Sequence, residues 1–277
     1  MIGTCALVAN RYWLDQLVTP HLTRHAWRAR DLATGRAVTV WRPGTSPAAT
    51  AECFLAAAGH TARIRHPAIA RIFDFGVAEP DGLPFAVAEP ADGTLLAAIM
   101  QAGPLDPLWI LDIVQQVASA LSEVQGSGLR LAVNPWSLRL APGGAVKVAG
   151  FDLRQEAGCR ADDPGDNLYR LGLVAWGCLT GQLPSVRAWQ DGAPTRDARQ
   201  ASLTLSPLPG TTPAGIAMLA ADLTGDGPAA RRADTAHVLA QCAELLTAPM
   251  RPRQPARTSC PGGTSLLDAP ECEHHYV

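Results

Sequence analysis

The chain has 277 residues and a formal net charge of −2, and 47% of its residues are hydrophobic while 17% are charged. A nearly neutral chain gives no reason to expect nucleic acid or an anionic membrane as a partner, and no apolar run is long enough to span a bilayer. The hydrophobic content suffices for a sizeable core, so we expect one large domain or two small ones.

Cysteine usage and the start of the chain both point to a cytoplasmic protein. The seven cysteines are scattered without a C-x-x-C pair, which is typical of reduced thiols and not of a disulfide framework. The first ten residues have neither a charged start nor a long apolar middle, so no signal peptide is predicted. Cys272, His274 and His275 lie close together but have no partner cluster, so a solvated tail is preferred over a metal site.

The first part of the chain combines strand signals with one helix. Residues 11–42 and 69–89 alternate between apolar and polar side chains, broken by Gly and Pro, as strands do. Residues 49–64 are rich in Ala and predict a helix.

The second part of the chain predicts helices. Residues 107–126 present one broad apolar face at helical spacing, and residues 171–179 are apolar nearly all round, as expected of a central buried helix. Residues 234–246 predict a final amphipathic helix. Residues 249–277 are rich in Pro, Gly, Arg and Thr, which predicts a disordered tail.

The most informative motif lies between these helical segments. Residues 130–137 read R-L-A-V-N-P-W-S, and a strand-like stretch then ends in Gly150-Phe151-Asp152. These residues resemble the loop H-R-D-x-K-P-x-N and the following D-F-G of protein kinases. Ser137 and Gly150 are 13 positions apart, which is the usual separation in that family. The chain therefore resembles a bacterial-type Ser/Thr protein kinase.

Further matches follow the family's order along most of the chain. They are the V-A-I-K strand at 38–41, the helix at 54–58, the L-x-H-P-N-I-V segment at 63–69, the hinge strand at 85–90, the D-x-Y-x-L-G helix at 167–172 and the D-P-x-x-R-P segment at 227–231. The resemblance implies an α+β fold of two lobes. Residues 1–90 would form a small, mainly antiparallel β lobe with one principal helix, residues 91–248 a larger helical lobe, and residues 249–277 the tail. Only 17 positions separate Gly150 from Asn167, which implies a shortened activation segment.

The positions at which the family transfers phosphate hold other residues here. Trp41 stands at the place of the phosphate-binding Lys, and Ala57 at that of its Glu partner. In the loop and after it, Ala132, Asn134, Ser137 and Gly150 replace the base Asp, the loop Lys and the two metal ligands. Phosphoryl transfer depends on positioning and charge stabilisation by such groups. We therefore expect a degenerate kinase that is not an enzyme and has no catalytic residue, metal ligand or cofactor.

The favoured interpretation is a pseudokinase that acts as a regulatory or scaffolding module and binds one or more proteins. The alternative is a metal-independent sensor of a nucleotide or small metabolite. Its remnant cleft would be formed by Trp41, Ala88, Glu89 and Ala91, and the small Ala88 would leave room for a ring the size of adenine. An atypical nucleotide-dependent transferase is a third, less favoured interpretation. Weak nucleotide binding is compatible with each of them.

Overall fold

The computed structural model describes residues 7–21, 24–43, 48–90, 92–125, 127, 131–150, 164–182, 207–224 and 234–247, and the statements below concern these residues. Residues Met1–Leu246 form one compact unit, and Thr247–Val277 form a second.

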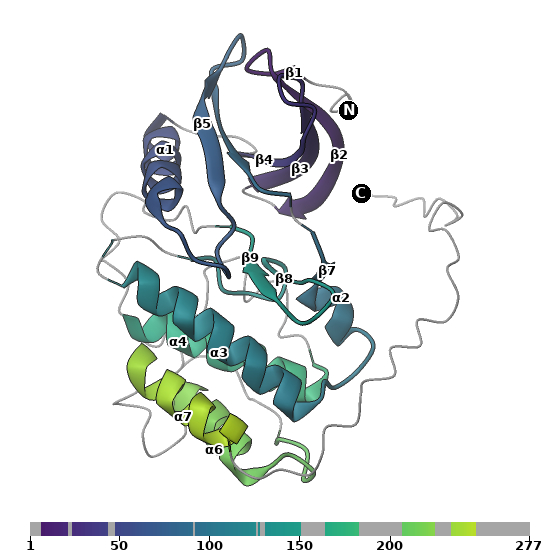
Figure 1. Cartoon of the computed structure of the whole chain (residues 1–277), viewed down its shortest axis with the longest axis vertical. Coiled ribbons are helices and arrows are strands. Elements are labelled where there is room, and N and C mark those ends of the chain that lie inside the picture. Colours follow the sequence, from purple (N-terminus) through teal and green to yellow (C-terminus); the bar gives the residue numbers. More distant parts are fainter. Residues whose placement is uncertain are drawn as a thin grey trace, which may run out of the picture. The chain divides into compact units, whose positions relative to one another are not determined.

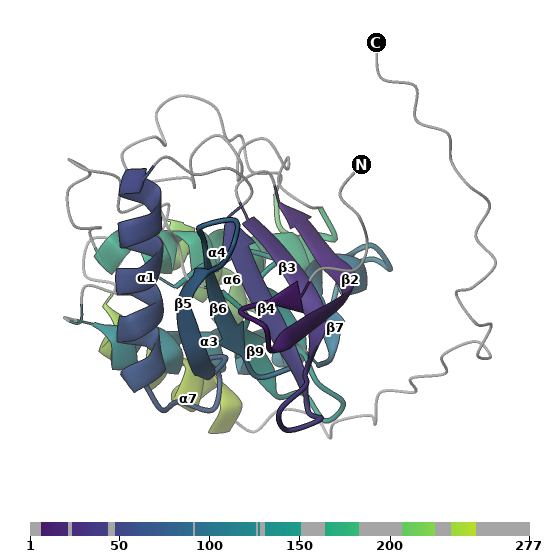
Figure 2. The same cartoon turned by 90° about the horizontal axis from the view of Figure 1, so that it is seen from above.

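Six described strands form a curled antiparallel sheet in the first part of the chain. They are β1 (Leu7–Val8), β2 (Tyr12–His21), β3 (Arg24–Asp31), β4 (Ala37–Pro43), β5 (Ile72–Ala78) and β6 (Leu83–Ala88). Their order in the sheet is β1-β2-β3-β4-β6-β5. The helix α1 (Ala48–Arg63) follows β4 and packs against β5 and β6, as Figures 1 and 2 show from two directions.

The pleat of β4 separates two apolar clusters. Val38 and Val40 belong to a cluster that the six-stranded sheet builds by itself, together with Trp27 of β3. Trp41 belongs to the main cluster, which also contains residues of α1 and of the helices that follow. Successive side chains of a strand point to opposite faces. The face that holds Trp41 is therefore directed toward α1 and the helical part of the chain.

The second part of the chain is mainly helical, with one small sheet. Its elements are β7 (Thr94–Leu95), α2 (Leu96–Met100), α3 (Pro107–Val124), β8 (Leu138–Leu140), β9 (Val146–Val148), α4 (Pro164–Thr180), α6 (Ala214–Thr224) and α7 (Thr235–Thr247). The helix α3 packs against α4, and α4 packs against α6. The strands pair in the order β7-β8-β9.

The helix α3 shows how local chemistry defines an element. The carboxylate of Asp106 accepts hydrogen bonds from the N–H groups of Leu108 and Trp109, and Pro107 occupies the first helical turn. Both features favour the start of a helix at this point, because the first N–H groups lack partners within the helix. Burial of one large apolar side chain contributes about 1.5–3 kcal/mol. The buried face of α3 therefore adds much more to stability than its cap.

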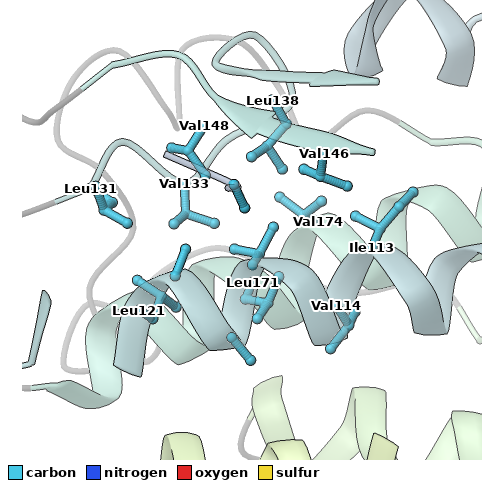
Figure 3. Packing of buried hydrophobic residues seen from close by; sticks show 14 of the residues in the cluster. Ile113, Val114, Leu121, Leu131, Val133, Leu138, Val146, Val148, Leu171 and Val174 are labelled. Carbon is cyan, nitrogen blue, oxygen red and sulfur yellow. The ribbon is translucent and has the colours of Figure 1, made fainter. Parts of the chain in front are cut away.

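Figure 3 shows how the buried face of α3 meets its neighbours. Ile113, Val114 and Leu121 gather with Leu171 and Val174 of α4. From the loop before β8 and from the small sheet, the same cluster receives Leu131, Val133, Leu138, Val146 and Val148. This common core places the loop 131–137 and the strands β8 and β9 above α3 and α4.

The segment that leads into β5 is attached to the small sheet and to α3. The N–H of Ala70 donates to the carbonyl oxygen of Val148 over 3.1 Å, and the N–H of Val148 donates to that of Ala68 over 2.8 Å. Nε2 of His66 lies 3.0 Å from Oγ of Ser119 on α3. These contacts join the part of the chain that holds the six-stranded sheet to the part that holds the helices.

The predicted α+β class is confirmed. The helices predicted at 49–64, 107–126 and 234–246 correspond to α1, α3 and α7, whereas the one predicted at 171–179 is the second half of the longer α4. Of the predicted shortened activation segment between Gly150 and Asn167, residues 151–163 lie outside the described residues, as does the predicted tail. The lobe boundaries at residues 90 and 248 stay predictions. In the described part of the chain, no helix is long and apolar enough to cross a membrane.

Candidate functional site

The loop from Leu131 to Ser137 is closed by the side chain of Ser137. Its hydroxyl donates to the carbonyl oxygen of Ala132, and its Oγ lies 3.2 Å from the main-chain N of Asn134, which donates to it. Oδ1 of Asn134 accepts a hydrogen bond of 3.0 Å from the N–H of Trp136. Ser137 is only 7% exposed. Both polar side chains at the predicted family positions therefore bond to the main chain of their own loop.

Ala132 and Gly150 lie together where the resemblance implies two carboxylates. The N–H of Ala132 donates to the carbonyl oxygen of Gly150 over 3.3 Å, and a Cβ at Gly150 would lie 3.7 Å from the Cβ of Ala132. The φ angle of Gly150 is +150°, which residues with a side chain rarely adopt. Space would permit a side chain at this position, but the backbone conformation favours glycine.

Trp41 of β4 and Ala57 of α1 are both buried in the main apolar cluster, with 7% and 8% of their surface exposed. One turn after Ala57, the hydroxyl of Thr61 donates to the carbonyl oxygen of Ala57 over 2.8 Å. The polar group of Thr61 is thus satisfied within α1. An indole and a methyl group therefore stand where the resemblance implies an ion pair, and this side of the site is apolar.

The segment that follows β6 retains an ionic connection to the small sheet. Ala88 ends β6, is fully buried and lies opposite Thr39 of β4. Oε1 of the next residue, Glu89, lies 2.5 Å from Nζ of Lys147 on β9. Ala91, the remaining predicted cleft residue, lies outside the described residues. The structure thus places Trp41 and Ala88 on one sheet face, with Glu89 at its edge.

Two arginines lie near this segment, and one of them, Arg139, was missed by the sequence interpretation. Arg139 of β8 is 8% exposed, and its Nη1 donates to the carbonyl oxygen of Gly93 over 3.0 Å. Arg28 of β3 lies directly opposite Thr39 in the six-stranded sheet. A signal for Arg139 was present in the sequence, because it stands between Leu138 and Leu140 in a strand of otherwise apolar character. Charged residues are rarely buried in such a strand without a reason.

The two arginines make this part of the site electropositive. Burial lowers the pKa of Arg139, the positive charge of Arg28 lowers it further, and the carboxylate of Asp92 acts in the opposite direction. Within the described ranges, no group of three or more His, Cys, Asp or Glu side chains could hold a metal ion. The tail residues Cys272 and His274 fall outside those ranges. The described site therefore offers cations to a ligand.

Comparison with known proteins relates the chain to mycobacterial kinases. It is 26% identical to the serine/threonine-protein kinase PknA of Mycobacterium tuberculosis over 286 aligned residues, which cover 92% of this chain and 65% of PknA. It is 26% identical to the serine/threonine-protein kinase PknB of Mycolicibacterium smegmatis over 211 aligned residues, which cover 65% of this chain and 34% of PknB. The chain thus spans just under two thirds of the length of PknA. No protein-family model matches it.

These relatives correct one expectation and support another. Both are named as serine/threonine-protein kinases, which points to an enzyme, so the prediction that the chain is not an enzyme is contradicted. That prediction depended on a few replaced side chains, whereas the similarity to PknA extends over 92% of the chain. The curled sheet with its principal helix, the helical second part and this similarity together show that the chain has a protein kinase-like fold of the bacterial Ser/Thr type.

Proposed function

We propose that this protein kinase-like chain is a regulatory module that acts by binding a partner protein. The observation that supports this most strongly is the closed loop 131–137. The hydroxyl of Ser137 bonds to the carbonyl oxygen of Ala132 and to the N–H of Asn134, so the loop uses its own polar side chain for its own structure. A loop whose polar side chains are used for its own stability is suited to a fold that presents surfaces to another protein.

The attachments between the sheet and the helical part favour the same function. The ion pair between Glu89 and Lys147 and the contact between His66 and Ser119 connect these parts through side chains. The main-chain bonds of Ala70 and Val148 add a second attachment. A partner that contacts residues from both parts would therefore find them already positioned, which lowers the entropic cost of binding.

Reconstitution with a purified partner tests this function. The partner is first identified by cross-linking in cells that produce the full chain, and the complex is then rebuilt from purified components. Its stoichiometry is measured by light scattering, and the partner's own activity is measured with and without the chain. We expect a complex of fixed stoichiometry that forms without ATP and changes the partner's activity.

Phosphate transfer must be followed in the same sample, because the relatives are named kinases. Radiolabelled ATP with magnesium is added to the complex, and label on the partner is compared with complex lifetime. A partner that binds only as a phosphate acceptor and leaves after transfer is a substrate, and that result would contradict a regulatory role through binding.

A second candidate function is a metal-independent sensor of a nucleotide or small metabolite. It is favoured by Arg139 and Arg28, which supply positive charge beside the segment that follows β6. A regulatory module and a sensor are compatible, since a bound ligand can change how a surface is presented. The cytoplasmic location expected from the sequence stays a prediction.

A further inference from the structure

Arg28 belongs to a row of side chains on one face of the six-stranded sheet. It lies opposite Thr39 of β4, and Thr39 lies opposite Ala88 of β6. Directly opposite residues of an antiparallel pair place their side chains on the same face. Trp41, two positions beyond Thr39, shares this face and belongs to the cluster that includes α1 and the helices. Arg28 therefore projects from the face directed toward the helical part, and it is exposed to solutes.

Arg139 belongs to the small sheet, at the segment that follows β6. It pairs with Leu95 of β7, and its Nη1 donates to the carbonyl oxygen of Gly93 just before that strand. As a residue, Arg139 is 8% exposed. A guanidinium has five N–H donors. Among the described residues, the guanidinium of Arg139 donates a hydrogen bond to the carbonyl oxygen of Gly93. Its remaining N–H groups can therefore donate to a ligand.

The two positive charges act on each other. Burial and the positive charge of Arg28 both lower the pKa of Arg139. The carboxylate of Asp92 acts in the opposite direction and raises it. Arginine stays protonated at neutral pH, so it cannot relieve this cost by losing a proton. A buried cation beside a like charge is stabilised when an anion binds between them.

We propose that Arg28 and Arg139 bind the phosphate or carboxylate group of a small molecule, beside the row formed by Thr39 and Ala88. This inference specifies the ligand class of the sensor proposed above and rests on that function. The planar guanidinium fork matches the paired oxygens of both anions. The positive charge that the ligand needs comes from the chain itself, so binding requires no divalent metal.

Calorimetric titration of the full chain tests the site, in buffer stripped of divalent metals by a chelating resin. The probes are pyrophosphate, ADP, citrate and adenosine, so that phosphate, carboxylate and uncharged ligands are compared. We expect at least one anionic probe to bind and adenosine not to bind. Arg139→Leu and Arg28→Leu should each weaken that anion by about 10- to 100-fold, as expected for loss of one charge-assisted hydrogen bond.

A matched control is Arg36→Leu in the exposed turn between β3 and β4, which removes the same charge and should leave anion affinity unchanged. Without ligand, Arg139→Leu should melt at the same temperature as the wild type or higher, because a buried charge is lost. Arg139→Lys keeps the charge but loses the fork, so its affinity should be intermediate.

Several results would overturn the inference. One such result is equal anion affinity in the wild type and Arg139→Leu, together with a lower melting temperature of that variant. It would mean that Arg139 has only a structural role, through its hydrogen bond to Gly93. Binding of adenosine without any anionic probe would remove the anion site but leave the sensor function standing. Binding of none of the four probes would remove both.

Discussion

At the scale of single residues, the site is defined by side chains that bond to their own main chain. The hydroxyl of Ser137 donates to the carbonyl oxygen of Ala132, and the side chain of Asn134 accepts from the N–H of Trp136. The hydroxyl of Thr61 donates to a carbonyl oxygen within α1. The resemblance assigned Asn134 and Ser137 to positions of this loop. It could not predict that Ser137 would bond to Ala132, because this contact depends on the folded path of the loop. Arg139 was missed although it stands between two leucines in the sequence, because the short strand β8 that contains it was not recognised.

Ser137→Ala should lower the free energy of unfolding by about 1–3 kcal/mol, because a buried carbonyl and a partly buried N–H would lose their partner. Urea denaturation monitored by circular dichroism measures the change. The matched control is Ser122→Ala on the exposed face of α3, where we expect less than about 0.5 kcal/mol. Equal small effects at both positions would show that the hydroxyl of Ser137 does not stabilise the loop.

Gly150→Ala should destabilise the fold by about 1 kcal/mol or more, because a residue with a Cβ rarely adopts its φ of +150°. The added Cβ itself meets Ala132 at an ordinary contact distance. Gly210→Ala is the control, since its φ is not positive and no atom lies within 4 Å of the added Cβ. A neutral result at position 150 in the same urea assay would mean that the local backbone relaxes freely.

His66 predicts a dependence of stability on pH. Its Nδ1 accepts from the N–H of Ala68, so Nε2 carries the proton that is donated to Ser119. Burial lowers the pKa of His66 below its ordinary value of 6.5. Below pH 6.5 the unfolded chain therefore binds more protons than the folded one, and stability falls as the pH falls.

The test compares the free energy of unfolding of wild type and His66→Asn between about pH 7.5 and 5. The amide can replace the acceptor but does not titrate, so the loss of stability on acidification should be smaller in this variant. His60→Asn, at an exposed position of α1, should keep the wild-type slope. A wild-type slope in His66→Asn as well would exclude His66 as the cause.

At the scale of elements, close contact between α4 and α6 depends on one glycine. A Cβ at Gly172 would lie 2.6 Å from the Cβ of Leu223 and 2.9 Å from the main-chain N of Thr224. The backbone of α6 cannot yield as a side chain can. The motif that contains Gly172 was recognised in the sequence, but the partner helix that requires glycine there was not.

Gly172→Ala should cost about 1–3 kcal/mol, because α4 and α6 would have to separate. Gly215→Ala is a matched comparison, since its Cβ would meet only the end of the Leu245 side chain, which can change rotamer. Both substitutions improve helix propensity. Thermal unfolding should therefore show a large loss at position 172 and a small change at position 215, and the reverse order would contradict the packing argument.

Element prediction from the sequence succeeded where the periodic pattern was long. The helix α3 was predicted because apolar residues recur at helical spacing over about five turns, starting at Pro107. The strands β7 and β8 have two and three residues, which is too short for a pattern of alternation to be recognised. The strand β9 is equally short, but the stretch that contains it was recognised as strand-like from the motif at Gly150. For α4, the apolar pattern indicated only residues 171–179, and the resemblance extended the predicted helix back to Asn167, three residues after its start at Pro164.

At the scale of the whole molecule, the chain has a protein kinase-like fold of the bacterial Ser/Thr type. The similarity to PknA covers 92% of the chain, and the predicted fold class agrees with the structure. The expectation about enzyme activity failed because single positions were given more weight than this overall similarity. The site offers the cations Arg28 and Arg139, and its described residues hold no metal cluster.

The central claim about the site is our proposal that it binds a small anionic ligand through the chain's own cations. The most direct test is a thermal-shift titration of the unmodified full chain with ADP, ATP and GTP, each with and without magnesium or manganese. Ligand binding raises the melting temperature by mass action, so weak binding is visible at millimolar nucleotide. We predict stabilisation of the same size with and without metal. Stabilisation that occurs only with metal would contradict the claim, because it would require carboxylate ligands in place of the arginines.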